Sequence, residues 1–459
     1  MNERYFERRQ VREAIDWAES GGVAVHRNFD HYHGTRSARG FVMTRPFLHV
    51  IGLRPVLEAW ATANGVPVQA IQPEKRRRVA HIDVFGDYAL QLLARVEPVV
   101  AAAASFEGFT RVGSKLYGRL SGRILTDPEL LELASRAPVG QPPPNLLFGA
   151  VHYLLLRGVS HPLARFYPSL NGGQDLAEDP FPAFRAFCLA NAGAITDLMG
   201  RRTVQTNEVA RSSALQRGFA VIAERTGLPL ALIEVGASAG LNLIGDRYRY
   251  AYQGGGPRGG VAEHRPERGR PLSPSMELGD PASEVIIDCR LRGELNPPRG
   301  VAPVAWRIGI DRNPIDIGDT DQALWLRALV WPDQPWRAEL LLAAIRSARE
   351  DPPRVLRGDA VEMLPEVLAK APPNTALCVY SSFMLYQLGP IEAQRLESLL
   401  ADAGSLRPVH RLALEWNPTD RPYLDLHGPD GERTRLAAAH HHGEWLEWLD
   451  ADSASGNLR

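Results

Sequence analysis

Cysteine is scarce in this chain, which has only Cys188, Cys289 and Cys378 among 459 residues. The three lie far apart and form no Cys-x-x-Cys pair, which argues against a disulfide framework and a four-cysteine zinc site. Long apolar runs are also missing. No stretch of about 18 uncharged apolar residues occurs, and the first ten residues lack the apolar core of a signal peptide. We therefore expect a cytoplasmic protein without a membrane span.

A large net charge is absent as well. Lys and Arg total 52, Asp and Glu total 53, and the formal net charge is -1. No overall field favours nucleic acid or an anionic membrane, and the basic run at 75–78 is typical of a solvated loop. We predict a small-molecule substrate, no nucleic-acid partner and no membrane partner. The sequence leaves the oligomeric state open.

The pattern of apolar residues divides the chain into three predicted parts. Residues 1–95 indicate a small α/β unit of unknown role. Residues 96–228 indicate a mainly helical domain that would cover a pocket and select the substrate. From 229 to 459 strands and helices alternate, which is typical of a Rossmann-like, doubly wound parallel sheet with helices on both faces. The expected fold class is α/β.

Several local predictions follow the same patterns. Residues 4–19 indicate one amphipathic helix, and residues 66–71 a strand. The stretch 246–303 is rich in Gly, Pro and Arg and reads as an insertion with one strand at 284–289. A short helix is expected around Trp445 and Trp448.

The stretch 230–244 is the centre of the functional prediction. An apolar strand ends at Glu234-Val235, followed by the turn Gly236-Ala237-Ser238-Ala239-Gly240 and a predicted helix that contains Asn242. Such a turn exposes backbone N–H groups at a helix start, and glycines let a cofactor approach closely. Ser238 and Leu241 break the Gly-x-Gly-x-x-Gly fingerprint of dinucleotide-binding folds. The alternative is a tight packing turn without a ligand.

Polar residues also end the later strands of this part. Asp311 follows the second strand, Asp359 and Ala360 the third, and Ser381 the fourth. A carboxylate at the second strand tip can bind both ribose hydroxyls of an adenosine ligand, usually about 20 residues after the glycine turn. The insertion explains the much longer spacing to Asp311. Ordinary turn chemistry is the other interpretation of the sequence after Asp311.

A dense polar segment precedes the predicted helix at 212–226. It includes Gln205, Thr206, Asn207, Glu208 and Arg211. One hypothesis places Gln205, Asn207 and Glu208 over the cofactor turn as donors and acceptors. The other assigns Thr206 or Asn207 to capping of the following helix, with Glu208 favoured by the helix dipole.

Histidines gather in the first part of the chain. Imidazole and carboxylate groups suit zinc, manganese or iron, so the candidate ligands are His31, His33, His81 and Asp83. Their spacing matches no recognised ligand motif, and hydrogen-bonded surface histidines are the simpler interpretation. The sequence therefore predicts no metal. A metal site at His440-His441-His442 is not expected either, because adjacent side chains point apart.

The glycine turn resembles the first motif of class I S-adenosylmethionine-dependent methyltransferases, with Ser238 in place of the middle glycine. The strand, Gly358-Asp359-Ala360 and helix resemble the third motif, whose acid hydrogen-bonds the adenine amino group. This resemblance implies a methyltransferase-type sheet, S-adenosylmethionine as cofactor and methyl transfer as activity. No general base stands out, and the candidates are Tyr380, Ser382, Glu415 and His152.

Seven segments carry a second resemblance: 141–145, 151–158, 182–188, 204–209, 234–243, 327–332 and 357–360. Through them residues from about 104 to 450 are similar to the domain-of-unknown-function 2332 family. It implies no established activity. Two other classes stay open: a nucleotide-using enzyme such as an oxidoreductase, and a non-catalytic binding protein on a degenerate Rossmann-like fold.

Overall fold

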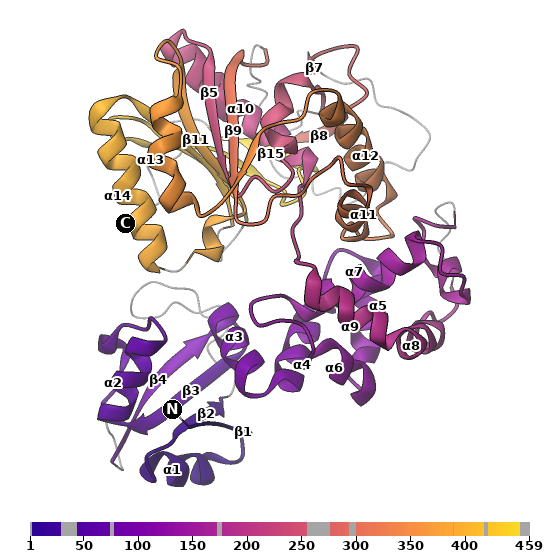
Figure 1. The fold of residues 1–459 in the computed structure, drawn as a ribbon, viewed down its shortest axis with the longest axis vertical. Coiled ribbons are helices and arrows are strands. Elements are labelled where there is room, and N and C mark those ends of the chain that lie inside the picture. The colour runs from indigo at the N-terminus through magenta and orange to yellow at the C-terminus, as the bar shows by residue number, and fades with distance from the viewer. Residues whose placement is uncertain are drawn as a thin grey trace. The chain divides into compact units, whose positions relative to one another are not determined.

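The computed structural model describes residues 2–28, 44–73, 78–171, 177–254, 276–292, 300–388, 390–416 and 421–449. The chain forms two compact units, which Figure 1 shows as ribbons. The first unit comprises Met1–Val204 and Trp331–Pro335, and the second comprises Gln205–Val330 and Trp336–Arg459. Each unit contains one sheet among its described residues.

The sheet of the first unit has four strands, in the order β1 (Glu3–Phe6), β2 (Val23–Arg27), β3 (Phe47–Leu53) and β4 (Val79–Phe85). β1 is parallel to β2, and the other neighbours are antiparallel. Successive side chains point to opposite faces. One face packs against α2 (Arg54–Ala63) and α3 (Gly86–Val96), and α1 (Val11–Glu19) covers part of the other.

Two local predictions for this sheet are wrong. Residues 4–19 do not form one helix, because Glu3–Phe6 pairs in register with Val23–His26 as β1 and the helix begins only at Val11. This pairing fixes Tyr5 and Phe6 on opposite faces and overrides the helical periodicity. The predicted strand at 66–71 is a short 3-10 turn, Val68–Ala70, that follows Pro67.

Helices fill the rest of the first unit: α4 (Pro98–Phe109), α5 (Lys115–Ile124), α6 (Pro128–Ala134), α7 (Pro143–Leu156), α8 (Phe181–Ala190) and α9 (Ala192–Arg201). Asp127 caps the start of α6, since the Leu130 N–H donates to Asp127 Oδ1 at 3.0 Å. Buried residues occur on all sides of α7, which forms the centre of this helical group.

The sheet of the second unit contains eleven strands in the order β10-β9-β5-β11-β12-β13-β14-β15-β8-β6-β7. Its first five members are all parallel: β10 (Val355–Arg357), β9 (Val304–Asp311), β5 (Leu230–Val235), β11 (Ala376–Ser382) and β12 (Val409–Glu415). Numbered along the chain, their order is 3-2-1-4-5. The direction of strand addition therefore reverses between β5 and β11.

Helices cover both faces of these parallel strands (Figure 1). On one face α13 (Ala360–Lys370) and α14 (Pro390–Leu406) pack on residues such as Ile233 and Val379. On the other, α10 (Ser212–Thr226) and α12 (Pro335–Glu350) pack on residues such as Leu232 and Cys378. The two-residue alternation along β5 and β11 divides one apolar run between two separate cores. The fold is mixed α/β, with mostly parallel strands in the larger sheet.

The insertion contains more structure than the sequence predicted. Its described residues form β6 (Arg249–Gln253), β7 (Met276–Gly279) and β8 (Ile286–Arg292), which extend the far edge of the sheet. β13 (Tyr423–His427) and β14 (Arg433–Ala439) form an antiparallel hairpin. β15 (Trp445–Trp448) joins β14 to β8. The prediction of a helix around Trp445 and Trp448 is wrong. These residues form β15, in which alternate residues are buried, as in a strand with one face on the core.

Candidate ligand site at the strand tips

The turn after β5 has an unusual backbone. Gly236, Ser238 and Gly240 have left-handed φ values of 78°, 53° and 73°. Glycine adopts this conformation freely, whereas a serine there is strained by about 1 kcal/mol or more. Ser238 thus keeps a glycine-like conformation at the position where the resembled motif has glycine. The turn leads into a 3-10 segment, η4 (Leu241–Arg247), and not into the predicted helix.

Protein acceptors already bind most N–H groups of this turn. The Gly236 N–H donates to the Ile310 carbonyl at 2.9 Å. The Ser238 N–H donates to Asp311 Oδ2 at 2.8 Å, and the Leu241 N–H to Asn207 Oδ1 at 3.0 Å. The expectation of bare donors facing a cofactor is therefore wrong for these three groups. Neighbouring residues shape the turn.

Both glycines are also closely packed. A Cβ on Gly236 would lie 2.4 Å from Met384 Cγ, and a Cβ on Gly240 would lie 2.9 Å from atoms of Pro353 and Val355. Such contacts exclude any larger residue. Close packing is thus sufficient to explain both glycines without a ligand.

Asp311 connects the turn to the polar segment that precedes α10. Its Oδ1 accepts from Gln205 Nε2 at 3.0 Å and from the Asn313 N–H at 2.7 Å, while Oδ2 accepts from Ser238. A carboxylate offers about four acceptor positions. These three bonds therefore leave about one position at the tip of β9.

The polar segment does lie beside the turn, as one of the two hypotheses proposed. Gln205 reaches Asp311, and Asn207 caps η4 through Leu241. Neither Thr206 nor Asn207 caps α10, which begins without a side-chain cap. Glu208 is engaged elsewhere, in a buried ion pair with Arg337 whose Nε lies 2.8 Å from Glu208 Oε2.

Glu234 and Tyr380 face each other across β5 and β11, at the point where strand order reverses. Both are buried, with Glu234 2% exposed. Burial raises the pKa of Glu234 to about 8, although Tyr380 and Asn242 lie near enough to oppose the shift. Among the described residues, neither Glu234 Oε2 nor the Tyr380 hydroxyl has a partner with full hydrogen-bond geometry. Asn242 Oδ1 accepts from Ser212 Oγ at 2.8 Å.

The tips of β11 and β12 are joined by Glu415. Its Oε1 accepts from Ser381 Oγ at 2.9 Å and from the Met384 N–H at 3.1 Å. Burial raises its pKa despite these bonds. Within the described part of the chain, Glu415 Oε2 and Ser382 Oγ lack partners. Phe383, which follows Ser382, has a left-handed φ of 55°. It is the second residue other than glycine with this conformation among the described residues at this edge, after Ser238.

Asp359 and Ala360 lie at the start of α13, as the sequence predicted. Asp359 Oδ1 accepts from the Val361 N–H at 2.9 Å, and Oδ2 accepts from Arg312 Nε at 3.0 Å. Burial alone would raise the pKa of Asp359, but the Arg312 and Val361 hydrogen bonds outweigh it and lower the pKa. Both oxygens thus serve a helix cap and an ion pair.

Sequence reasoning missed the His440-His441-His442 turn as a neighbour of these strand tips. β14 runs parallel to β12, so this turn lies at the same edge. The His441 carbonyl accepts from Arg211 Nε at 2.9 Å, and the Arg211 guanidinium lies 4.1 Å from the Phe383 ring centre. Burial and nearby arginines lower the pKa of His440 to about 4 and of His441 to about 3. No spacing rule could have found this turn, since strand pairing brings it here.

The remaining candidate base and the candidate metal ligands belong to the first unit, and two of them lie outside the described residues. His152 is buried in α7, with Nε2 2.9 Å from Ser169 Oγ. His31 and His33 lie outside the described residues. His81 and Asp83 lie together with His49, a residue that was not among the predicted ligands.

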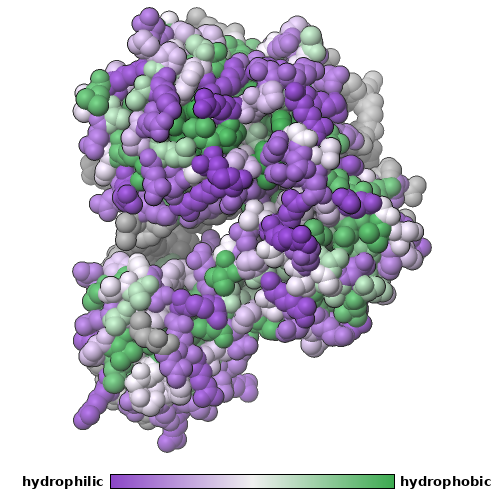
Figure 2. Space-filling view, in the orientation of Figure 1, coloured by the Kyte–Doolittle hydropathy of each residue, from purple (hydrophilic) through white to green (hydrophobic). Residues whose placement is uncertain are grey.

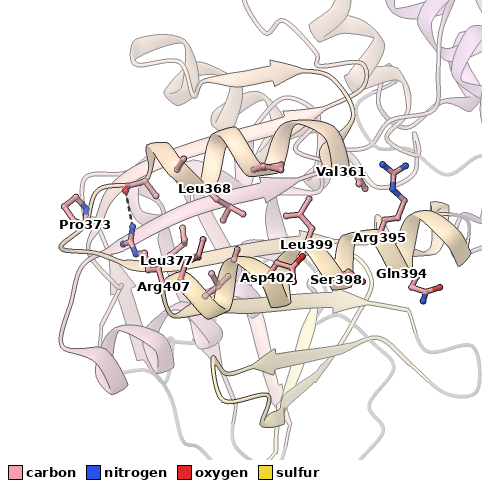
Figure 3. Close-up of a pocket in the computed structure, with 16 residues that line it drawn as sticks. Val361, Leu368, Pro373, Leu377, Gln394, Arg395, Ser398, Leu399, Asp402 and Arg407 are labelled. Carbon is pink, nitrogen blue, oxygen red and sulfur yellow. Dashed lines mark hydrogen bonds between the residues drawn. The ribbon is translucent and has the colours of Figure 1, made fainter.

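A large groove of the second unit lies elsewhere. It has a volume of about 1150 Å³ and runs between α13 and α14, over Leu368, Leu377 and Leu399 (Figure 3). None of the predicted cofactor residues lines it. In the space-filling view, hydrophobic surface in green interrupts the hydrophilic surface of this unit (Figure 2).

The second unit is thus a mixed α/β unit whose polar groups gather at the carboxyl ends of parallel strands. Residues 103–448 match the family described as "Uncharacterized protein conserved in bacteria (DUF2332)". The chain belongs to this family, which confirms the similarity drawn from its sequence segments. The sheet β1–β4 lies outside the match. No curated protein and no solved structure matches the chain. Among the described helices, none has the length and apolar character to cross a membrane.

Proposed function

We propose that the second unit binds S-adenosylmethionine at its strand tips and transfers a methyl group to a small molecule. The observation that carries the proposal is the buried pair Glu234 and Tyr380, which face each other at the strand-order reversal, and neither Glu234 Oε2 nor the Tyr380 hydroxyl has a partner of full hydrogen-bond geometry among the described residues. In open α/β sheets with this strand order, ligands bind beyond the carboxyl ends of the strands at that reversal. Buried polar atoms without partners require an explanation, and a bound group supplies one.

Backbone strain supports the same location. Ser238 and Phe383 follow β5 and β11, the two strands that flank the reversal, and both are left-handed. Strained residues of this kind cluster at ligand and active sites, where the surrounding structure holds them in place. Two such residues on neighbouring strand tips favour a ligand site over an ordinary pair of turns.

Specific residues fit the proposed cofactor. Asp311 retains about one acceptor position for a ribose hydroxyl. The buried Glu234 carboxyl would face a cationic group, which would favour its ionised form. The cofactor would supply the methyl group, and this chain would bind and orient both reactants. Of the candidate bases, Tyr380, Ser382 and Glu415 lie at this edge, and Glu415 with its raised pKa is the best suited.

A second candidate is a non-catalytic binding protein on the same fold. The contacts of Met384 with Gly236, and of Pro353 with Gly240, favour it because they fill the space beside both glycines. A cofactor that approached the turn closely would have to displace Met384. Ligand binding without turnover would support this candidate.

The test is a thermal-shift measurement on the full chain with S-adenosylmethionine, S-adenosylhomocysteine, NAD and ATP. A ligand at 100 times its Kd stabilises the folded state by about 2.7 kcal/mol. We expect a shift with the two S-adenosyl compounds, and we expect Glu234→Gln and Asp311→Asn to reduce it. Asp402→Asn in the α13–α14 groove is the matched control and should keep the full shift. A shift with NAD alone would favour an oxidoreductase, and no shift with any compound would refute the proposal.

A further inference from the structure

The first unit contains a histidine and carboxylate cluster that is separate from the strand tips of the second unit. His49 lies on β3, and His81 and Asp83 lie on β4. One nitrogen or oxygen atom from each side chain lies within 4.8 Å of the other two. In the β3–β4 register, His49 pairs with Asp83 and Ile51 pairs with His81. The three side chains therefore emerge on one face of an antiparallel pair.

That face is only partly covered. α1 packs over Ala24 and Ile51, which lie on the same face as the cluster. The side chains of His49, His81 and Asp83 are 29%, 26% and 43% exposed. An ion bound there would thus keep coordination positions open to solvent.

The distances suit a small divalent ion. His49 Nε2 lies 3.2 Å from Asp83 Oδ1, and His81 Nε2 lies 3.8 Å from the same oxygen. Ligands bound to zinc at about 2.1 Å in tetrahedral geometry lie about 3.4 Å apart. Small side-chain rotations would bring the three atoms to this spacing.

A neighbouring side chain orients the carboxylate. Gln72 Nε2 donates to Asp83 Oδ2 at 2.6 Å, so Oδ1 is directed toward the two imidazoles. Hydrogen bonds of this kind hold metal ligands in position in known sites. The Asn28 amide lies 2.8 Å from His49 Nε2, and a bound ion would take that nitrogen's lone pair in its place.

We propose that His49, His81 and Asp83 form a binding site for a divalent transition-metal ion, with Zn²⁺ as the best fit. Two imidazoles and one carboxylate with open positions are a ligand set of zinc and of non-haem iron. The hard ion Mg²⁺ prefers oxygen ligands and is not expected to bind.

The chain offers an internal comparison for this proposal. His440, His442 and Glu444 form a second group with the same spacing limit. Arg337 and nearby arginines lower the pKa of both histidines there, after the larger effect of burial. The same positive field opposes a cation. We therefore assign the metal to the first group alone.

The experiment titrates the metal-stripped full chain with Zn²⁺ by calorimetry, and with Co²⁺ followed by its visible absorption. Mg²⁺ serves as the hard-ion comparison. We expect one Zn²⁺ per chain. His49→Ala and His81→Ala should each weaken binding by more than about 100-fold, because even outer-shell changes cost 10–100-fold. The double variant His440→Ala/His442→Ala should bind as the wild type does.

Folding of the variants is checked by circular dichroism. Asp83→Asn keeps the shape of an exposed side chain and removes one charge, so it tests the site even if a histidine variant unfolds. The proposal is overturned if the wild type binds no Zn²⁺, or if Asp83→Asn binds as tightly as wild type. It is also overturned if the His440/His442 variant, and not the His49 variant, loses the metal.

Discussion

The histidine cluster of the first unit and the strand tips of the second differ in how their charges are balanced. Burial would raise the pKa of Asp83, but contacts with His49 and His81 outweigh it and lower the pKa. At the strand tips, burial raises the pKa of Glu234 and Glu415. In the first region two imidazoles approach the Asp83 carboxylate, whereas in the second the nearby cation Arg211 does not offset the burial of Glu234 and Glu415.

The difference bears on what each region requires. A balanced and exposed cluster needs no ligand for stability and can bind a cation by small rotations. An unbalanced buried cluster stays protonated or destabilises the fold, unless a ligand provides the missing charge or hydrogen bonds. We therefore expect the strand tips to respond more strongly to substitution, to pH and to ligands.

The largest effect is expected at another buried carboxyl of the second unit, one that does have its cation. Glu208 and Arg337 are 6% and 7% exposed and form a two-nitrogen contact. Arg337→Met would leave Glu208 buried without its cation. Breaking a buried pair in this way costs about 3–5 kcal/mol. Chemical unfolding of the full chain, followed by the fluorescence of its tryptophans, measures the loss.

Arg337→Lys is the matched control, because it keeps the charge and loses the two-nitrogen geometry. We expect it to lie between wild type and Arg337→Met. Equal stability of wild type and Arg337→Met would show that Glu208 finds another partner or becomes protonated at little cost. A nearby cation would then contribute less to the stability of a buried carboxyl than we infer.

The next effect is a pH dependence from Glu234. Its pKa rises from 4.5 in the unfolded chain to about 8 in the folded one, so the folded state binds the proton more tightly. Its stabilising contribution is complete below pH 4.5 and is lost as the pH rises through about 8. The loss is at most about 1.4 kcal/mol per pH unit. Glu234→Gln should remove this slope.

The measurement compares melting temperatures of wild type and Glu234→Gln from pH 5 to pH 9. The difference between the two cancels the other titrating groups, including His440 and His441. We expect wild type to lose stability relative to the variant as the pH rises. Parallel curves would mean that Glu234 has a normal pKa, and would remove the main electrostatic argument for a ligand at this edge.

Much of this fold could be predicted from residue patterns, because the parallel strands are apolar runs between clear helix signals. The second and fourth predicted strands, whose ends were placed at Asp311 and Ser381, correspond to β9 and β11. β1 and β15 were missed because a short strand is decided by its pairing partner, which local periodicity does not contain. β6 was missed for the same reason within the insertion.

The sequence could predict which residues lie at the candidate site, but not the contacts that these residues make. The sequence indicates acids at strand tips, but Asp311 and Asp359 turn out to hold a turn and a helix start. It also could not bring His49 to Asp83, or the His440 turn to the tip of β12. Those neighbours depend on strand register and on strand order. Contacts between distant segments therefore set which candidates are available to a ligand.

The smallest effect is expected from Ser238→Gly, which tests whether strain at the strand tips is real. Glycine removes a left-handed strain of about 1 kcal/mol or more and adds about 0.4–1 kcal/mol of unfolded-chain entropy. Ser238 Oγ has no hydrogen-bond partner in the described structure, so its loss costs no such bond. We expect a net stabilisation of about 0–2 kcal/mol, the difference between these opposing terms.

Gly236→Ala is the opposing variant at the same turn. Its new Cβ would lie 2.4 Å from Met384 Cγ at a left-handed φ of 78°, so we expect a clear loss of stability. Unfolding measured on both variants separates strain from packing. If Ser238→Gly destabilises the protein, the Ser238 side chain has a structural role and its backbone strain ceases to be evidence for a ligand. If it stabilises the protein and weakens S-adenosylmethionine binding, the strain serves the site.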